Sequence, residues 1–430
     1  MYLKKQFILL IAVFTFIGFL SCETPNNHQN ETTTYNKSIK LDNKNINNNS
    51  LSSQILNEEK DTAQREFLNI VLMLPLSGKH YQIGKSLLNS AQLAVEKKNN
   101  KKIIFTIIDT GDEEQLLSRL YSVLEDDIDI IIGPVFSDKV NQVREVTKNK
   151  DIPIVAFSNN SKIQDNRLYV FGLKLEDEIK ELLTYSIKRN LKKYAVLVPR
   201  NEFGSRVEKE IKQFQSKNNL STFNFTFYNP NSPDFYDVSK NVSNFEERKA
   251  NLEKKIKQLE KENSEKAKEE LKKLKKLDTY GELNFEALII FAQNFQEVSN
   301  FSSILPYYDV DPKKVQYIGS SLWAKNLSLK EPGLDNGYFA SLDIDNRRKF
   351  EDMYLEIFNS KPHSLAALSY DIVGLISNLH KDKNNFTIEK LHNSNGFIGI
   401  NGWFKMTSNG NVSRQPKIYK IKNQKFSLLN

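Results

Sequence analysis

Residues 67–78, FLNIVLMLPLSG, form a continuous apolar run that ends in a Pro-x-Ser-Gly turn. A run without polar alternation is typical of a strand that is buried on both faces of a parallel sheet. The residues that follow, 81–100, place Leu87, Ala91 and Ala94 at helical spacing. The sequence therefore predicts a buried strand followed by an amphipathic helix as its first folded unit.

The same alternation continues along the chain. Strand-like runs recur at 101–111, 128–136, 152–159, 168–173, 193–200 and 285–293, and helical patterns separate most of them, at 113–126, 137–150, 176–190 and 205–214. Strands that alternate with helices of 10–15 residues indicate βαβ units with right-handed crossovers. We expect an α/β fold built on doubly wound parallel sheets.

In doubly wound sheets, the loops at the carboxyl ends of the strands face the ligand. Here these loops are predicted at 75–78, 109–111, 133–137, 157–160, 199–204, 291–293 and 319–323. Most of them carry a polar side chain, and several carry a glycine, which lets the backbone approach a ligand closely. They are the candidate binding loops, although the same residues also serve as ordinary turns between strands.

Four segments in this order carry a family resemblance: LPLSGKHYQIGKSLLNSAQLA (74–94), IIGPVFSDKV (131–140), IPIVAFSNN (152–160) and LVPRNEFG (197–204). Together with a C-terminal helix and a Gly-rich hairpin, they resemble the type I periplasmic-binding-protein fold of leucine-binding receptors. Within that group they are similar to the penicillin-binding-protein activators. The resemblance covers 67–430 apart from one insertion.

The resemblance implies two α/β lobes that are joined by three crossovers, with a cleft between them that closes by a hinge. On this basis we expect residues 67–172 and 321–395 to form the first lobe. Residues 173–320 and 396–430 should form the second lobe.

In amino-acid-binding relatives, hydroxyl and backbone N–H groups of the first lobe hold the ligand carboxylate. By position, the resemblance assigns this role to Ser137, Ser158 and Asn159, and it assigns aromatic wall positions to Tyr81 and Phe203. The other cleft candidates are Ser77, Phe157, Phe171 and Trp323.

A carboxylate of the second lobe pairs with the ligand ammonium in those relatives. The corresponding place here reads Ala292-Gln293-Asn294 and holds no carboxylate. Because a buried ammonium without a counter-charge costs several kcal/mol, this weakens the prediction that the cleft binds an amino acid. Gln293 could still accept one hydrogen bond, and Glu202 is an alternative carboxylate nearby.

A highly charged segment, 243–280, interrupts the second lobe where the family has a short loop. Its apolar residues keep helical spacing in two sets, 252–259 and 271–277, on either side of Asn263 and Ser264. The pattern favours a coiled-coil-like helical hairpin with a net charge of about +4, and one long helix is the alternative. Leucines left exposed on it would indicate a partner helix.

The amino terminus has the pattern of a bacterial lipoprotein. Lys4 and Lys5 precede an apolar run that ends at Leu20, and Cys22 follows Ser21. This is typical of a signal peptide (1–21), and Cys22 resembles the lipid-attachment cysteine of lipoproteins. Glu23 in the next position favours the outer membrane over the inner one. Residues 22–66 are rich in Asn, Ser, Thr and Lys and are predicted to be a disordered tether.

Composition excludes several classes of protein. The chain has one Cys and five His, which argues against a disulfide framework, a metal cluster or a metal cofactor. The net charge of +8 is weakly basic for 430 residues, and the basic insertion has no interleaved aromatics, so we expect no nucleic-acid partner. Two features suggest catalytic chemistry: Asp109 and Asp112 flank a glycine without a neighbouring His, and His80 lies beside Ser77, but no G-x-S-x-G motif supports a nucleophile there.

The sequence thus predicts a non-enzymatic, periplasmic, lipid-anchored protein with no cofactor. The resemblance implies that it activates a peptidoglycan synthase. The alternative is a solute receptor that delivers an amino acid or an amide to an ABC permease.

Overall fold

The structure is a computed structural model that describes residues 66–218, 223–325, 331–381 and 386–429. The predicted signal peptide, Cys22 and residues 22–65 of the predicted tether lie outside the described residues.

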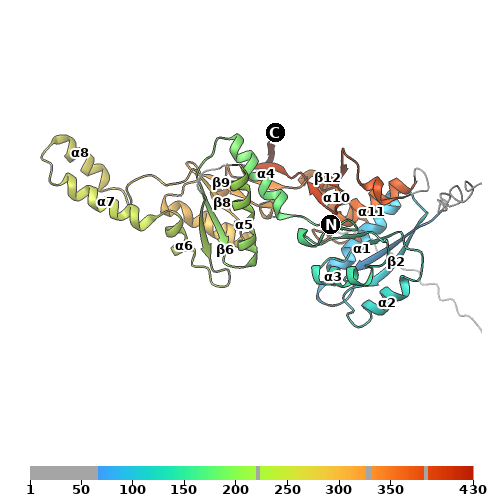
Figure 1. The fold of residues 1–430 in the computed structure, drawn as a ribbon. Helices are drawn as coiled ribbons and strands as arrows, with labels where there is room; N and C mark the ends of the chain where they lie inside the picture. Colours follow the sequence, from blue (N-terminus) through green and yellow to red (C-terminus); the bar gives the residue numbers. More distant parts are fainter. Residues whose placement is uncertain (1–65, 219–222, 326–330, 382–385, 430) are drawn as a thin grey trace, which may run out of the picture. The chain divides into compact units, whose positions relative to one another are not determined.

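The first sheet has five parallel strands in the order β2-β1-β3-β4-β5. They are β1 (Leu68–Leu74), β2 (Ile103–Asp109), β3 (Ile130–Ile132), β4 (Ile154–Ala156) and β5 (Leu168–Val170). On one face, α1 (Tyr81–Lys98) and α11 (Ala366–Lys381) lie side by side although they are far apart in sequence (Figure 1). On the other face lie α2 (Leu116–Val123) and α3 (Ser137–Val146). This sheet and its helices form the first lobe.

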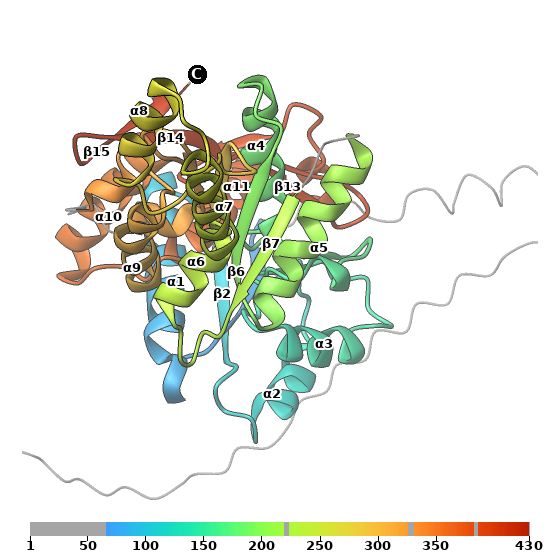
Figure 2. The ribbon, with the colours of Figure 1, turned by 90° about the vertical axis from the view of Figure 1, so that its left-hand side faces the viewer.

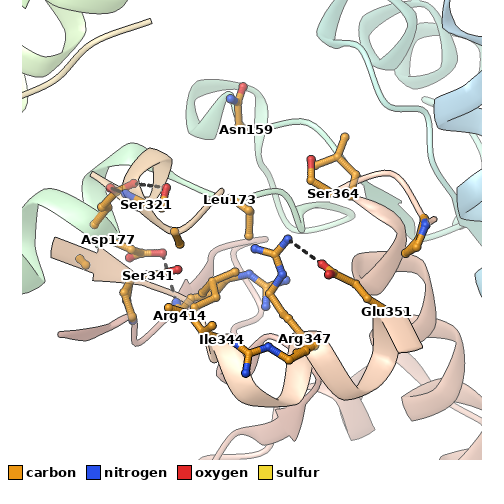
Figure 3. A pocket seen from close by; sticks show the side chains of 18 of the residues that line it. Asn159, Leu173, Asp177, Ser321, Ser341, Ile344, Arg347, Glu351, Ser364 and Arg414 are labelled. Carbon is orange, nitrogen blue, oxygen red and sulfur yellow. Dashed lines mark hydrogen bonds and ion pairs between the residues drawn. The ribbon is translucent and has the colours of Figure 1, made fainter. Parts of the chain in front are cut away.

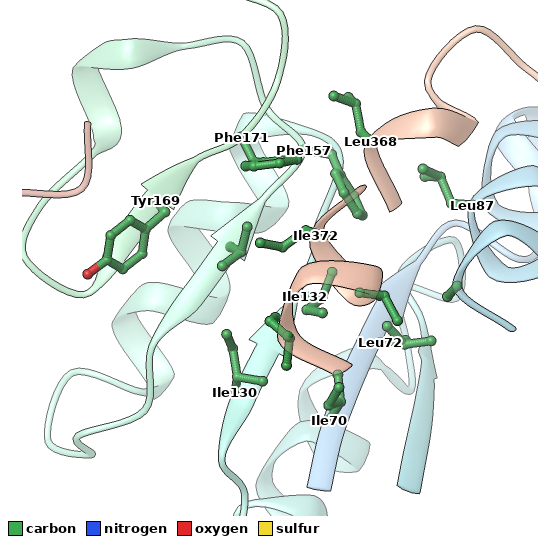
Figure 4. Close-up of a cluster of buried hydrophobic side chains, with 14 of the residues drawn as sticks. Ile70, Leu72, Leu87, Ile130, Ile132, Phe157, Tyr169, Phe171, Leu368 and Ile372 are labelled. Atoms are coloured by element: carbon green, nitrogen blue, oxygen red, sulfur yellow. The ribbon is translucent and has the colours of Figure 1, made fainter. Parts of the chain in front are cut away.

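The core of the first lobe explains the unbroken apolar run at 67–78. Ile70 and Leu72 pack toward α1 and α11, where they meet Ile132, Phe157 and Ile372 (Figure 4). Val71 and Met73 point the other way and pack with α2 and α3. Since both faces of β1 are covered, its residues do not alternate between apolar and polar, and Ile70–Leu74 are all apolar.

The second sheet repeats this strand order and extends it. Five parallel strands run in the order β7-β6-β8-β9-β10, and two antiparallel strands, β14 and β15, follow β10. They are β6 (Tyr194–Pro199), β7 (Phe223–Tyr228), β8 (Ala287–Ile290), β9 (Gln316–Gly319), β10 (Tyr338–Ser341), β14 (Lys417–Lys422) and β15 (Lys425–Leu429). The predicted α/β fold with parallel sheets is confirmed.

Helices cover both faces of the second sheet as well. One face holds α4 (Leu175–Lys188) and α5 (Glu202–Lys217), and the other holds α6 (Phe235–Val242) and α9 (Phe295–Ile304). Figure 2 shows β6 and β7 with α5 on one side and α6 and α9 on the other. This sheet and its helices form the second lobe.

The division of the chain between the lobes differs from the prediction in two places. Residues 321–395 were expected in the first lobe, but β10 pairs with β9 and β14 in the second sheet. Residues 396–430 were expected in the second lobe, but β11 (Phe397–Gly399), β12 (Gly402–Met406) and β13 (Val412–Arg414) form a small sheet of their own. This small sheet belongs to the first lobe, because Phe404, Met406 and Val412 are buried in its core.

The chain therefore passes between the lobes after β5, after β10 and after β13. The second passage leads into α10 (Ile344–Phe358), which packs on α1 and α11 through Phe350 and Tyr354. The third passage leads from the small sheet into β14.

The charged segment forms two helices, α7 (Phe245–Leu259) and α8 (Glu265–Leu274), which lie side by side (Figures 1 and 2). The buried residues Leu252, Leu259, Ala267 and Leu274 form a small core between them. Ion pairs join Lys255 to Glu270 and Lys275 to Glu260 across the hairpin. The structure thus has the hairpin and not one long helix. The leucines of the two helices face each other, except Leu277 beyond the end of α8, which is 51% exposed.

No helix within the described residues is long and apolar enough to cross a membrane. In the same part of the chain, no group of three or more His, Cys, Asp and Glu side chains is placed to hold a metal ion.

Candidate functional site

A cavity of about 660 Å³ lies where the passages between the lobes converge (Figure 3). Its walls come from the start of α4, the loop after β9, the end of β10, the outer face of α10 and residues 414–416. Asn159, from the loop after β4, also contributes. Both lobes and all three passages therefore meet around one cavity.

Charged side chains of both signs line this cavity. The cations are Lys174, Arg347, Arg348, Lys361 and Arg414, and the acids are Asp177, Glu178, Glu351 and Asp352. The described lining residues include no His and no Cys. The cavity thus supplies charges and hydroxyl groups that can bind polar partners, without an imidazole or a thiol.

Arg414 is the deepest cation, with only 5% of the residue exposed. Its Nη2 donates to the Phe171 carbonyl at 2.9 Å, and its guanidinium lies 4.4 Å from the centre of the Phe171 ring. Burial lowers the pKa of Arg414 to about 10, against the opposing effect of the negative charges of Asp371 and Asp177. Arg414 therefore remains a cation at neutral pH, held between an aromatic ring and two carboxylates.

Asp371, on α11, is the buried carboxylate whose negative charge acts most strongly on Arg414. It accepts hydrogen bonds from the N–H groups of Ile400 and Asn401, at 2.6 and 3.2 Å, and from Asn401 Nδ2 at 3.0 Å. Burial raises the pKa of Asp371, and Arg414 opposes this shift. A Cβ at Gly399 would lie 2.5 Å from the carboxylate, so the glycine is needed for the strand to pass this close.

Polar contacts tie the three passages to one another. Two bonds join the first passage to the third. The backbone N–H of Arg414 donates to Asp177 Oδ2 at 3.1 Å, and Lys174 Nζ donates to Asn411 Oδ1 at 2.7 Å. An ion pair joins the second passage to the third, with Lys417 Nζ 2.6 Å from Asp343 Oδ2. Burial alone would raise the pKa of Asp343, but hydrogen bonds from Lys417 and from the Asn346 N–H hold it below its ordinary value.

Glu178, in the first turn of α4, holds the loop that follows β9. Its carboxylate accepts from the N–H of Ser321 and, at 3.2 Å, from the Ser321 hydroxyl. Burial raises the pKa of Glu178 to about 7, and the two hydrogen bonds from Ser321 lower it in part. This wall of the cavity therefore changes its charge near neutral pH.

The predicted carboxylate-holding residues are only partly brought to the cavity. Asn159 lines it. Ser137 and Ser158 are brought together, but their Oγ atoms lie 2.8 Å apart and form a hydrogen bond to each other. Ser158 Oγ also accepts from the Asn160 N–H at 3.1 Å. Neither hydroxyl is part of the cavity lining.

Three predicted residues belong to the hydrophobic cores. Phe157 and Phe171 are buried in the core of the first lobe, although the carbonyl and ring of Phe171 hold Arg414. Trp323 is fully buried in the second lobe, where its ring covers Gly319. Their apolar side chains are used for packing, and none of the three lines the cavity.

The predicted wall residues Tyr81 and Phe203 also lie elsewhere. Tyr81 is exposed, and the Lys85 ammonium lies over its ring, 5.7 Å from the ring centre. Phe203 packs against Phe291 in the core of the second lobe. Glu202 is exposed at the first position of α5. None of them lines the cavity.

The loop after β1 has a structural role. Asp109 accepts from the N–H groups of Leu76 and Gly111, each at 2.7 Å. Burial opposes ionisation of Asp109, but these bonds and hydrogen bonds from Ser77 lower its pKa. His80 instead packs against the Phe136 ring, with centroids 4.4 Å apart. Ser77 is thus part of a turn that Asp109 holds in place.

At the place expected for an ammonium-binding carboxylate, the structure holds a carboxylate that is already used. Glu297, four residues after Gln293, accepts from the Gln293 N–H at 3.0 Å and from the Tyr228 hydroxyl. It also accepts from Asn294 Nδ2 at 3.1 Å, and the residue is only 6% exposed. Glu297 therefore closes the β8–α9 turn, and no carboxylate there is free for a ligand ammonium.

Sequence reasoning missed Arg414, Asp371, Asp177, Glu178 and Asp343. Asp371 stands between the apolar residues Tyr370 and Ile372, which is a weak signal for a buried charge, but both neighbours of Arg414 are polar. The electrostatic interaction between them joins residues that are 43 positions apart and lie in different elements. No local pattern reveals such a pair.

The chain matches known proteins in both sequence and structure. Residues 43–273, more than half of the chain, match the family described as "LppC putative lipoprotein". A curated relative, an uncharacterized protein of Rickettsia prowazekii, is 24% identical over 196 residues, which are 45% of this chain and 53% of that protein. The chain thus matches about half the length of this relative.

Two solved structures show the fold. The C-domain of LpoA from Haemophilus influenzae, a regulator of PBP1A, is 17% identical with a TM-score of 0.60, covering 84% of this chain and 100% of that one. The "putative branched-chain amino acid ABC transporter" of Rhodospirillum rubrum is 14% identical with a TM-score of 0.65, also over 84% and 100%. Both likenesses support the type I periplasmic-binding-protein fold. From the match over 43–273, this chain belongs to the LppC lipoprotein family.

Proposed function

We propose that this chain is a lipid-anchored periplasmic protein that binds a peptidoglycan synthase, a penicillin-binding protein, and raises its activity without being an enzyme itself. Cys22 is the proposed attachment point of the lipid. Because Glu23 follows it, we place the anchor in the outer membrane.

Membership of a lipoprotein family and a fold shared with a regulator of PBP1A both support this proposal. The fold alone does not separate a regulator from a solute receptor, since both kinds of protein share it. The choice between them rests on the groups that an amino-acid ligand would need.

The observation that carries the proposal is that those groups are bonded within the chain. Ser137 and Ser158 bond to each other, so only one of their two hydroxyl protons remains for a ligand carboxylate. Glu297 uses its carboxylate on Tyr228, Gln293 and Asn294. An amino acid would have to break these bonds or leave its own charge unpaired, and either costs several kcal/mol.

The contacts among the passages support a protein that presents a fixed surface. A solute receptor closes around its ligand by bending at such passages. Here the bond between Asp343 and Lys417, and the bond from Arg414 to Asp177, would both be strained by that bending. A regulator that offers one surface to a partner has no need to bend.

A binding experiment tests the proposal. Full-length chain, purified in detergent, is immobilised and exposed to a purified bifunctional penicillin-binding protein from the same organism. We expect saturable retention that an excess of untagged chain competes away. Absence of retention across salt concentrations from low to physiological would contradict the proposal.

The lipid anchor has its own test. Cells that express the chain are fed an alkyne-labelled fatty acid, and the label is expected on wild type and not on the Cys22→Ser variant. Density fractionation of the membranes then shows whether the labelled protein is in the outer membrane. Label on the serine variant would contradict the role of Cys22.

A second candidate function, a solute receptor for an amino acid or an amide, is favoured by the cavity itself. Its volume of about 660 Å³ is within the range of small-molecule sites, and it holds charges of both signs. A thermal-shift screen of amino acids and amides distinguishes the two functions. Stabilisation by several degrees would support the receptor and contradict the first proposal.

A further inference from the structure

The base of the α7–α8 hairpin carries an unusual concentration of exposed apolar side chains. Tyr236, Leu277, Tyr280 and Tyr307 are 60, 51, 38 and 79% exposed. Only one other large apolar side chain of the second lobe, Leu428, is exposed to a similar degree among the described residues. Single exposed apolar residues need no explanation, but several on adjoining elements indicate a contact surface.

Hydrogen bonds and helix packing place the segments that carry these four residues next to one another. Thr279, next to Tyr280, donates its hydroxyl to Asp309 Oδ2 at 2.7 Å, and Asp309 is two residues after Tyr307. Tyr236 lies on α6, which packs against the turn that contains Tyr307, η3 (Leu305–Tyr308), and against the start of α7. We refer to Tyr236, Leu277, Tyr280 and Tyr307 as the tyrosine cluster.

The hairpin is fixed to this base by a buried arginine. Arg248 is 9% exposed. Its Nη1 lies 3.2 Å from Asp309 Oδ2, and its Nε donates to the Gly281 carbonyl at 3.2 Å. The Tyr280 N–H donates to the Arg248 carbonyl at 3.0 Å, and the Phe245 ring packs edge-on against Tyr308. The two helices also bury their own core, so the hairpin is a folded extension of the cluster.

Beyond the tyrosine cluster, the hairpin is basic. Residues 245–277 hold twelve Lys and Arg against eight Glu, a net charge of +4. Eight of its lysines are exposed and form no ion pair with a described residue: Lys249, Lys254, Lys257, Lys261, Lys266, Lys272, Lys273 and Lys276. Such a surface attracts an acidic partner and accelerates its association.

The partner that fits is a folded protein. Glutamates are interspersed among the lysines, so a uniformly anionic membrane or polymer would meet repulsion at several points. A protein surface can place acids opposite the lysines and avoid the glutamates. Tyrosine is also among the residues that contribute most at protein interfaces, because a large ring and a hydroxyl become buried together.

We infer that the tyrosine cluster and the basic hairpin form the docking surface for an acidic face of the partner protein. The inference rests on the proposed function, since it takes the partner to be the peptidoglycan synthase. In this arrangement the tyrosines are buried at the centre of the contact, and the lysines steer the approach from its rim.

The test measures the binding of full-length chain to the purified synthase by biolayer interferometry. One variant, Tyr280→Ala with Tyr307→Ala, removes the central rings. A second, Lys272→Glu with Lys273→Glu and Lys276→Glu, reverses the rim charge. The matched controls lie in the first lobe: Tyr121→Ala, where the tyrosine is 59% exposed, and Lys97→Glu. Circular dichroism confirms that each variant has the wild-type unfolding temperature.

We expect the tyrosine variant to bind about tenfold more weakly or worse, mainly through faster dissociation. The charge variant should associate several-fold more slowly at low salt, and the difference should shrink as salt is added. Both controls should bind within twofold of wild type. If both docking variants bind the synthase as tightly as wild type, the inference is overturned and the proposed function stays intact.

Two other outcomes also decide the matter. If the wild type fails to bind the synthase, the proposed function fails, and the docking surface fails with it. If the charge variant loses binding to phosphatidylglycerol vesicles while keeping its affinity for the synthase, the hairpin is a membrane-binding element, and the inference is overturned.

Discussion

The Oγ atoms of Ser137 and Ser158 lie 2.8 Å apart, so the two hydroxyls that were expected to hold a ligand carboxylate hold each other. Ser137 begins α3, and Ser158 lies in the loop after β4. The bond therefore joins two neighbouring loops at the carboxyl edge of the first sheet. It gives these serines a structural role that needs no ligand.

Replacing either serine by alanine should weaken this junction. For Ser158→Ala we expect the free energy of unfolding to fall by about 1 kcal/mol, the usual contribution of such a hydrogen bond. Urea unfolding measures the change. Activation of the synthase should be the same as with wild type. If the variant instead loses thermal stabilisation by an amino acid that stabilises wild type, the serines are ligand residues and the receptor function is correct.

Replacing the buried cation should have a far larger effect. Arg414→Met removes the bond to Phe171 and leaves Asp371 without its counter-charge. We expect the free energy of unfolding to fall by about 3–5 kcal/mol, as when one partner of a buried pair is removed. Arg348→Met, at an exposed position on α10, is the matched control and should change it by less than about 0.5 kcal/mol.

The double variant Arg414→Met with Asp371→Asn isolates the interaction. Because the asparagine is neutral, it should recover part of the loss caused by Arg414→Met, and the two changes should be non-additive by more than about 0.5 kcal/mol. Strict additivity would mean that the two charges do not stabilise each other.

The raised pKa of Glu178 predicts that the free energy of unfolding depends on pH. Its pKa is about 7 in the folded chain because of burial, while an unperturbed glutamate has a pKa of about 4.3. Between these values the unfolded chain has lost the proton and the folded chain keeps it. Raising the pH through this window therefore lowers the free energy of unfolding, by at most about 4 kcal/mol.

The Glu178→Gln variant removes this titration and keeps an oxygen that can accept from Ser321. Its stability advantage over wild type should grow as the pH rises from about 4.3 to about 7 and then stay constant. Urea unfolding at several pH values measures it. Glu253→Gln, at an exposed position of the hairpin, is the control and should parallel wild type. Equal pH slopes for all three proteins would contradict the raised pKa.

The hairpin should unfold as a local unit. Leu259 is 3% exposed in the core between α7 and α8, so Leu259→Ala should destabilise the hairpin by about 2–3 kcal/mol. Hydrogen exchange of 245–274 should become faster, while exchange of β1 and β6 stays unchanged. Leu277→Ala, at an exposed site, should leave both regions as they are. Faster exchange in β6 would show that the hairpin is part of the main core.

The sequence predicted the parts of the fold that local patterns encode. The unbroken apolar runs at β1, β6 and β8 indicated strands covered on both faces, and the structure has them in parallel sheets. The two leucine sets around Asn263 indicated a hairpin, because each set fills only one face of a short helix. The strand 338–341 was placed in the wrong lobe, since its partners β9 and β14 cannot be inferred from its own residues.

The candidate site was predicted less well for the same reason. Asn159 lines the cavity, because the loop after a parallel strand faces the cleft. Arg414, Asp371 and Glu178 were missed because their function depends on burial and on partners far away in sequence. Trp323 was expected in the cleft from its position after a strand, but its large apolar ring contributes more when it packs over Gly319 in the core.

The most direct test of the account is the rate at which a purified peptidoglycan synthase polymerises glycan strands with and without this chain. Adding stoichiometric full-length protein should raise the rate several-fold. The Ser158→Ala variant should raise it equally, and the Tyr280→Ala, Tyr307→Ala double variant should lose the effect. An unchanged rate with wild-type protein, at concentrations where the two proteins bind, would contradict the central claim.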